Sequence, residues 1–474
     1  MRRAALVRGG SVVLLVATLA TAARSADASG LSNPFVGDAH GQPELANPYA
    51  AYFNPAALGG ITGTQILVDG TFSLGYVRFD RVAPLSPSPS NTTANSNYPL
   101  YVATNTGTNT AVNSGGIPFV GAATDFGSRV LFGGLALYAP FGGAIQWGKS
   151  SRWADDAAVP GAVDGPQRWQ SIGVVDSSLA TTAVIGARLA EARLSFGVGF
   201  TAYRHAVSLT KAFNSDGSDD VTAPNGELKE GRVLLNVSGV DFGASGGVYW
   251  EADREGKVRI GASYTSQPGF GTMRLKGTLE QRVGITPSGT TDVDLLQSYP
   301  DVVRLGIAYR VSDAIDLRLH GQFVRWSVFQ NACVVHSGDP CDLSGDGSAP
   351  KGQTAIIANV HAAFNDAYAV HAGVGYWPAK RVEIFADFGV DSSAVPTQSL
   401  GVSLFDSFKI IGGVGMRYRV SDHLMLAGSY TEFYYLPVTV TGQVEAPAPS
   451  DVPVANGSYA SHLMFANANA TVMF

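Results

Sequence analysis

The chain has 474 residues, of which 15% are charged and 45% hydrophobic, and its formal net charge is −6. The charged fraction is low for a soluble protein of this size, and the absence of a Lys/Arg cluster after the first ten residues argues against a nucleic-acid partner. The hydrophobic residues are spread evenly, with no polar linker dividing the chain, which favours one large domain.

Residues 1–26 have the layout of a cleaved secretion signal. Arg2, Arg3 and Arg8 precede an apolar run from Val12 to Ala20, and small residues follow, so we expect cleavage between positions 22 and 28. The apolar run is too short to span a bilayer, and no later run reaches about 18 apolar residues. These features leave a secreted protein, a periplasmic protein or an outer-membrane barrel.

Residues 27–60 form a compact segment without strand character. The Asn47-Pro48 and Asn54-Pro55 steps enclose a run of small and aromatic residues, and both prolines are acceptable at a first helical position. The run therefore predicts short helical turns. A strand pattern begins immediately after Gly60, so we interpret residues 27–60 as a plug for a barrel formed by residues 61–474.

Alternating hydrophobicity begins at Gln65. Ile66 and Phe72 lie on the apolar parity, and Asp69 and Ser73 lie on the polar parity. The same period of two recurs through the chain and ends at the terminal residue, Phe474. A soluble sandwich would show the same alternation, so the connections between the strands have to decide the fold class.

Seven long polar connections alternate with six short turns, which defines 14 antiparallel strands. An even number of strands, with the long loops at one end, is typical of an outer-membrane barrel, and aromatic residues near the strand ends suit the bilayer interfaces. We expect the long connections near 84–115, 148–170, 211–231, 269–300, 329–354, 391–405 and 436–457, and the turns near 126–128, 190–192, 252–254, 311–313, 378–380 and 420–422.

The two cysteines, Cys333 and Cys341, lie eight residues apart in a loop rich in Gly, Asp and Ser. A local disulfide is sterically easy at this spacing, and an exported protein meets oxidising conditions. A metal pair is the alternative, but His336 is the only neighbouring ligand and a structural zinc site needs a second pair.

The chain resembles the FadL-like family of outer-membrane transporters for long-chain fatty acids and other hydrophobic compounds. The likeness covers nearly the whole mature chain and is sharpest from Ser29 to Ala56, which is similar to that family's N-terminal hatch and its Asn-Pro-Ala motif. The resemblance implies a plugged 14-stranded barrel that captures its substrate at the extracellular loops and releases it sideways through the wall. Residues implicated in hatch gating are Asn47, Pro48, Phe53, Asn54, Pro55 and Ala56.

The third strand is where we expect the opening in the wall. Pro140 cannot donate a ladder hydrogen bond. Phe141 follows it, and the next two residues, Gly142 and Gly143, allow a bend or bulge. A local gap in strand pairing is one interpretation. The other is that Pro140 only ends the strand beneath an extracellular loop.

Two patterns in the sequence suggest other chemistry. The string from Gly243 to Gly247 matches the G-x-S-x-G pattern of serine hydrolases, but Ser245 lies in the middle of a strand rather than at a strand-to-helix turn. Acidic loops around Asp216 and Asp342 lack the spacing of a calcium loop, so we interpret them as solvated loops. We therefore predict neither an enzyme nor a metal site.

Ionisable residues on the inward parity have two interpretations: pairing across the lumen, or binding of a fatty carboxylate by one cation. The sequence does not choose between them. The residues on this parity are Arg259, Arg304, Arg318, His320, His371, Glu383, Asp387 and Arg417, of which Arg304 and Arg318 are carboxylate candidates together with Arg204, His205 and Lys211 near the end of the fifth strand.

These observations predict a passive transporter in the bacterial outer membrane, with long-chain fatty acids as the first guess for the substrate. No nucleotide-binding motif is visible, and we expect no cofactor. We expect contact with outer-membrane lipid and the barrel assembly machinery, and a monomer. The alternative is a surface barrel that acts as an adhesin or receptor through its long loops.

Overall fold

The computed structural model describes most of the chain after the predicted secretion signal. The signal itself and residues 27–40 of the predicted plug lie outside the described residues. Within the described part, no helix is long and apolar enough to cross a membrane. The described residues are 41–83, 98–128, 130–214, 216–223, 225–282, 289–403, 405–443 and 452–474.

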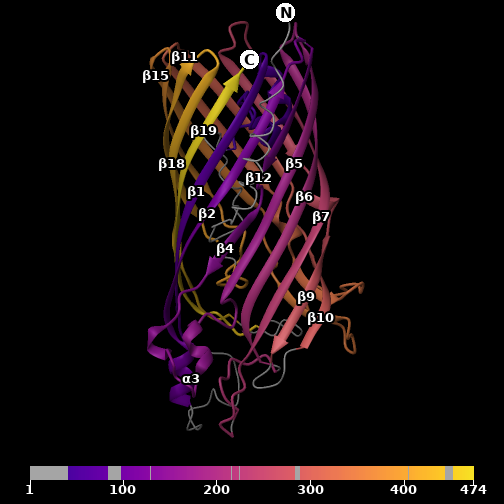
Figure 1. The fold of residues 1–474 in the computed structure, drawn as a ribbon, viewed down its shortest axis with the longest axis vertical. Coiled ribbons are helices and arrows are strands. Elements are labelled where there is room, and N and C mark those ends of the chain that lie inside the picture. Colours follow the sequence, from indigo (N-terminus) through magenta and orange to yellow (C-terminus); the bar gives the residue numbers. More distant parts are fainter. Residues whose placement is uncertain are drawn as a thin grey trace, which may run out of the picture.

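The wall is a closed antiparallel barrel (Figure 1). Nineteen strand segments form one sheet, which closes because β1 (Thr64–Arg81) pairs with both β2 (Gly107–Thr124) and β19 (Gly457–Met473). Five wall strands are each interrupted once, so the segments make 14 wall strands and confirm the predicted fold class. The other continuous strands are β5 (Gly173–Leu189), β6 (Leu194–Phe213), β7 (Gly231–Glu251), β16 (Val382–Asp391), β17 (Lys409–Ser421) and β18 (Leu424–Val440).

Each interrupted wall strand consists of two segments that pair with the same neighbouring strand or strands. Four of the interruptions contain glycine, proline or a short 3-10 turn, which favour a break in a regular ladder, and the fifth, residues 362–366, contains Ala363 with a positive φ of 48°. The pairs are β3 (Leu131–Tyr138) with β4 (Gly142–Gln146), β8 (Val258–Thr265) with β9 (Met273–Arg282), β10 (Gly289–Gln297) with β11 (Val302–Ser312), β12 (Ile315–Val324) with β13 (Asn331–His336), and β14 (Ile356–His361) with β15 (Ala367–Ala379).

The outer face of the barrel is apolar, and many polar side chains of the wall face inward. In β1 the Phe72 side chain is 53% exposed, whereas the adjacent Ser73 is fully buried. This is the alternation expected when lipid meets the outer face and the lumen holds polar groups. A soluble sandwich would bury the apolar side chains. The burial pattern therefore favours the membrane barrel over the sandwich, which the alternation alone could not do.

The two ends of the barrel differ. Figure 1 shows the carboxyl terminus at the end with short turns, and the long connections with helix α3 (Tyr98–Asn105) at the other end, which is the extracellular end in barrels of this kind. The predicted long loops at 269–300 and 329–354 are wrong in part, because they contain β9, β10 and β13. Short breaks such as η4 (Pro268–Phe270) interrupt the alternating pattern, so these strands were predicted as loops.

Within the residues that the structure describes, helical structure is confined to short elements. In the plug, Asn54 accepts a hydrogen bond from the Ala56 backbone N–H at 3.1 Å, and Pro55 takes the first position of the 3-10 helix that follows, where a missing N–H costs nothing. The helices besides α3 and η4 are α2 (Ala50–Phe53), η1 (Pro55–Gly60), η2 (Ser151–Trp153), η3 (Pro160–Asp164) and η5 (Trp326–Val328).

Candidate functional site

The plug is tied to the inner wall by hydrogen bonds. Asn54 Nδ2 donates to the backbone oxygens of Pro43 at 2.7 Å and Val248 at 3.0 Å. The Ser263 hydroxyl donates to the Phe53 carbonyl at 2.6 Å. These bonds satisfy buried polar groups that would otherwise be costly, so they hold the plug in one position.

Glycines in the wall let the plug backbone approach closely. A Cβ at Gly197 would lie 2.6 Å from the Ala56 nitrogen, and one at Gly261 would lie 2.2 Å from the Pro43 oxygen. Neither position leaves room for a side chain, because the opposing atoms are backbone atoms. The wall is therefore shaped to the plug.

Aromatic residues fill the space between the plug and the first wall strands. The Tyr49 hydroxyl donates to Asp69 at 2.5 Å, and its ring lies 4.7 Å from that of Phe119. The Tyr52 ring lies 4.6 Å from the Tyr138 ring. Phe53, Ala56 and Leu58 are also buried in this cluster. The plug is packed like a protein core, and we expect it to block the lumen.

Glu44 gives the docking of the plug a pH dependence. Burial raises the pKa of the Glu44 carboxyl from 4.5 to about 7, although Arg259 and Arg318 oppose this shift and Asp316 adds to it. The docked plug therefore holds a proton that a free plug would release. Docking of the plug is therefore most favourable below pH 4.5. It weakens as the pH rises, and the full free-energy cost of docking is reached once the pH passes about 7, where the docked carboxyl also ionises.

We expect this cost, about 3 kcal/mol from the two pKa values, to appear as increased ion leakage above pH 7. Conductance across planar bilayers would measure it below pH 4.5 and above pH 7. Glu44→Gln should abolish the difference, whereas Glu255→Gln, in an exposed turn, should retain it. Equal conductance of the unmodified protein at both pH values would contradict the assignment.

A second buried cluster, the apolar lumen cluster, lies beyond the plug. It includes Phe141, Tyr299, Trp326, Phe405 and Tyr459. Phe141 stacks on Tyr299 with ring centroids 5.0 Å apart and planes 7° from parallel. Because Phe141 lies at the break between β3 and β4, this cluster reaches the wall at that break.

The wall is incompletely paired at the same place. β2 pairs with β1 along its whole length but with β3 only from Phe119 to Thr124, and β4 pairs with β5. Among the described residues no ladder joins β2 to β4. Contact resumes farther along, where the Gln146 backbone N–H donates to Asn113 Oδ1 at 2.9 Å. The buried residues Pro140, Gly142 and Gly143 line the break.

The five basic side chains that the sequence identified as carboxylate candidates lie in different environments. Arg204 is exposed on the outer face, because successive side chains of β6 alternate and His205 takes the lumen side. The Arg204 side chain therefore faces away from the lumen, and its assignment as a carboxylate partner stays a prediction. Lys211 is half-buried near the extracellular end of β6. Arg318 donates to Glu383 and lies 3.4 Å from Asp316, so its charge is already balanced.

Arg304 has a different environment. Its side chain is 1% exposed, and its guanidinium lies 4.9 Å from the Tyr52 ring centroid and 5.5 Å from that of Phe53. Nη1 donates to the Thr265 hydroxyl at 3.2 Å, whereas Nε and Nη2 have no hydrogen-bond partner in the described part of the chain. Arg304 forms no ion pair with a described carboxylate, so it is a buried cation able to accept an anion.

His205 is the other buried candidate. Its two ring nitrogens have no hydrogen-bond partner within the described ranges. The ring stacks on Tyr203 and on Tyr299, and the Tyr299 hydroxyl donates to Asp176. The nearby acid makes this a poorer place for a carboxylate than Arg304.

Cys333 and Cys341 are joined by a disulfide. Four of the eight inward residues that the sequence identified join Asp316 in a ladder of ion pairs: Arg259 with Asp316, Asp316 with Arg318, Arg318 with Glu383, and Glu383 with Arg417. Asp316 was missed, although its inward parity was readable from the alternation of β12.

A plugged, outward-apolar barrel with a buried apolar lumen defines an outer-membrane transporter. The chain belongs to the family described as outer membrane protein transport protein (OMPP1/FadL/TodX), whose model matches residues 13–460. The protein is thus a transporter of the bacterial outer membrane, from a family that carries hydrophobic compounds, and not an enzyme.

Solved structures share the fold at low sequence identity. A FadL homologue from Pseudomonas aeruginosa is 13% identical over 95% of this chain and 98% of its own, with a TM-score of 0.71. The toluene transporter TbuX from Ralstonia pickettii is 15% identical over 93% and 99%, with a TM-score of 0.59. The toluene transporter TodX from Pseudomonas putida is 12% identical over 95% and 98%, with a TM-score of 0.60. No curated protein matches the sequence significantly.

Proposed function

We propose that this transporter carries long-chain fatty acids, or other hydrophobic small molecules, passively from the extracellular loops into the outer membrane. The observation that carries the proposal is the missing ladder between β2 and β4, which lies beside the apolar lumen cluster at Phe141. A lipidic substrate gains about 0.8 kcal/mol per methylene on leaving water. Sideways release into the bilayer keeps that gain, whereas release into the periplasm would lose it.

Arg304 favours an acid as the substrate. A hydrocarbon has no group to pair with a buried guanidinium, whereas a carboxylate would form charge-assisted hydrogen bonds with Nε and Nη2. The alkyl chain would then lie among the residues of the apolar lumen cluster. The solved relatives named for toluene show that the fold itself does not select fatty acids.

The same residue offers a route from ligand to plug. Arg304 lies over the Tyr52 and Phe53 rings, so a carboxylate that draws the guanidinium away would weaken these contacts. Asn47 borders a cavity of about 740 Å³ on the periplasmic side of the plug, which offers room for the segment to move. We infer that ligand binding loosens the run from Asn47 to Ala56.

A reversible lock tests sideways release. The last ladder pair between β2 and β3 is Phe119 with Tyr138, so Ile117 and Pro140 would face each other if the ladder continued. We expect the oxidised double variant Ile117→Cys/Pro140→Cys to bind fatty acid but to lose uptake into cells that lack their own transporter. Reduction should restore uptake.

The matched control is Val120→Cys/Leu137→Cys, which joins the same two strands where a ladder already exists. Its uptake should not change on oxidation. Normal uptake by the locked Ile117→Cys/Pro140→Cys barrel would argue against the opening in the wall. Failure of the unmodified protein to bind any fatty acid would favour the adhesin or receptor alternative.

A further inference from the structure

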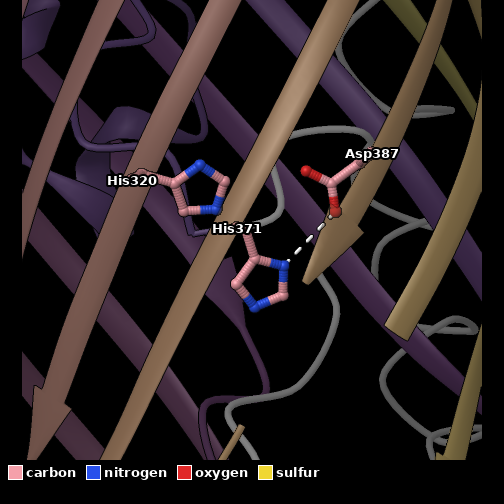
Figure 2. A group of neighbouring side chains, drawn as sticks. All are labelled: His320, His371 and Asp387. Atoms are coloured by element: carbon pink, nitrogen blue, oxygen red, sulfur yellow. Dashed lines mark hydrogen bonds and ion pairs between the residues drawn. The ribbon is translucent and has the colours of Figure 1, made fainter. Parts of the chain in front are cut away.

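Three side chains on the lumen face meet at one point of the wall. Figure 2 shows His320 on β12, His371 on β15 and Asp387 on β16, which are neighbouring strands. The ladder pairs His320 directly with His371. All three residues are buried, and one nitrogen or oxygen from each lies within 4.8 Å of the others.

The spacing of two of these groups already suits a metal ion. His371 Nδ1 and Asp387 Oδ1 are 3.3 Å apart. Two ligands bound tetrahedrally at about 2.0–2.1 Å would be separated by about 3.3 Å. The His320 ring lies parallel to the His371 ring, with centroids 5.1 Å apart, so a small rotation would bring its nitrogen into range.

The surroundings of His371 resemble the outer shell of a metal site. Its Nε2 lies 3.1 Å from Asp391 Oδ1, as expected when a ring nitrogen donates to a carboxylate and the other nitrogen faces a metal. A Cβ at Gly389 would lie 2.2 Å from His371 Nδ1, so the absent side chain leaves this nitrogen room. Two carboxylates and two neutral imidazoles together carry a charge that a divalent cation balances.

We propose that His320, His371 and Asp387 bind a divalent transition-metal ion of the zinc type, and that Asp391 orients His371. Imidazole and carboxylate are the ligands that such ions share, and the fourth position would be left to water. The ion would tie β12, β15 and β16 together close to the plug residue Gly41, where a Cβ would lie 3.9 Å from His320 Cδ2. This inference does not depend on the proposed substrate.

The competing arrangement has no ion. A protonated His371 would donate from both ring nitrogens, to Asp387 and to Asp391, and hold the same geometry. Calorimetric titration of the purified, tag-free barrel with Zn²⁺ separates the two. Co²⁺ provides a second readout, because its visible absorption reports tetrahedral coordination.

We expect one Zn²⁺ per barrel, loss of this site in His320→Gln and Asp387→Asn, and binding about 10–100-fold weaker in Asp391→Asn. His336→Ala, which removes an exposed histidine at the end of β13, is the matched control and should bind as the unmodified protein does. Heat-modifiable mobility on a gel verifies that each variant forms a barrel. Absence of binding to the unmodified barrel, or undiminished binding to folded His320→Gln and Asp387→Asn, would overturn the proposal.

Discussion

A valine in place of Gly197 is expected to open the barrel to ions. Its Cβ would lie 2.6 Å from the Ala56 nitrogen and from the Pro55 carbonyl carbon, and the two added methyl groups would extend farther into the plug. Overpacking of this kind costs about 1–3 kcal/mol or more, and the plug can avoid the cost by leaving its place. Ion conductance across planar bilayers should rise, as should the detergent sensitivity of cells.

Gly246→Val is the matched control for this change. Gly246 lies on the neighbouring strand β7, and the nearest atom to a Cβ there is 3.9 Å away, so the plug should remain docked. Deletion of residues 41–60 sets the upper limit of conductance. Conductance at the control level from folded Gly197→Val would show that the plug tolerates displacement without opening a path.

Arg304→Gln is expected to weaken fatty-acid binding about 10–100-fold. A hydrogen bond to a charged group contributes about 1.5–3 kcal/mol, and each 1.4 kcal/mol corresponds to about tenfold in affinity. A fatty alcohol of the same chain length should bind equally well to both proteins, because it lacks the negative charge. Calorimetry with the two ligands measures the difference.

Arg204→Gln makes the same chemical change on the outer face and should leave both affinities unaltered. His205→Gln tests the second buried candidate. If His205→Gln selectively weakens acid binding while Arg304→Gln does not, the head group binds beside Asp176 rather than above the plug. Equal weakening of acid and alcohol by Arg304→Gln would indicate a packing role.

Local sequence patterns were sufficient to predict the number of wall strands and the presence of a plug. Alternation with a period of two is a property of each strand, and the order of long and short connections is visible without knowing which strands pair. The Asn54-Pro55 step likewise acts through its own backbone. The loop predicted at 269–300 is wrong in part, because a short 3-10 turn at Pro268 interrupts a wall strand whose second segment, β9, pairs with β7 as β8 does.

The sequence by itself determined that this chain forms a plugged, 14-stranded outer-membrane barrel, and it identified the family. Only the tertiary structure decided that Arg318 is neutralised while Arg304 is not, although both have the inward parity. It also decided that His320 and His371 meet. The physical reason is that partners across a sheet depend on strand register, which is set by closure of the whole barrel rather than by any one segment.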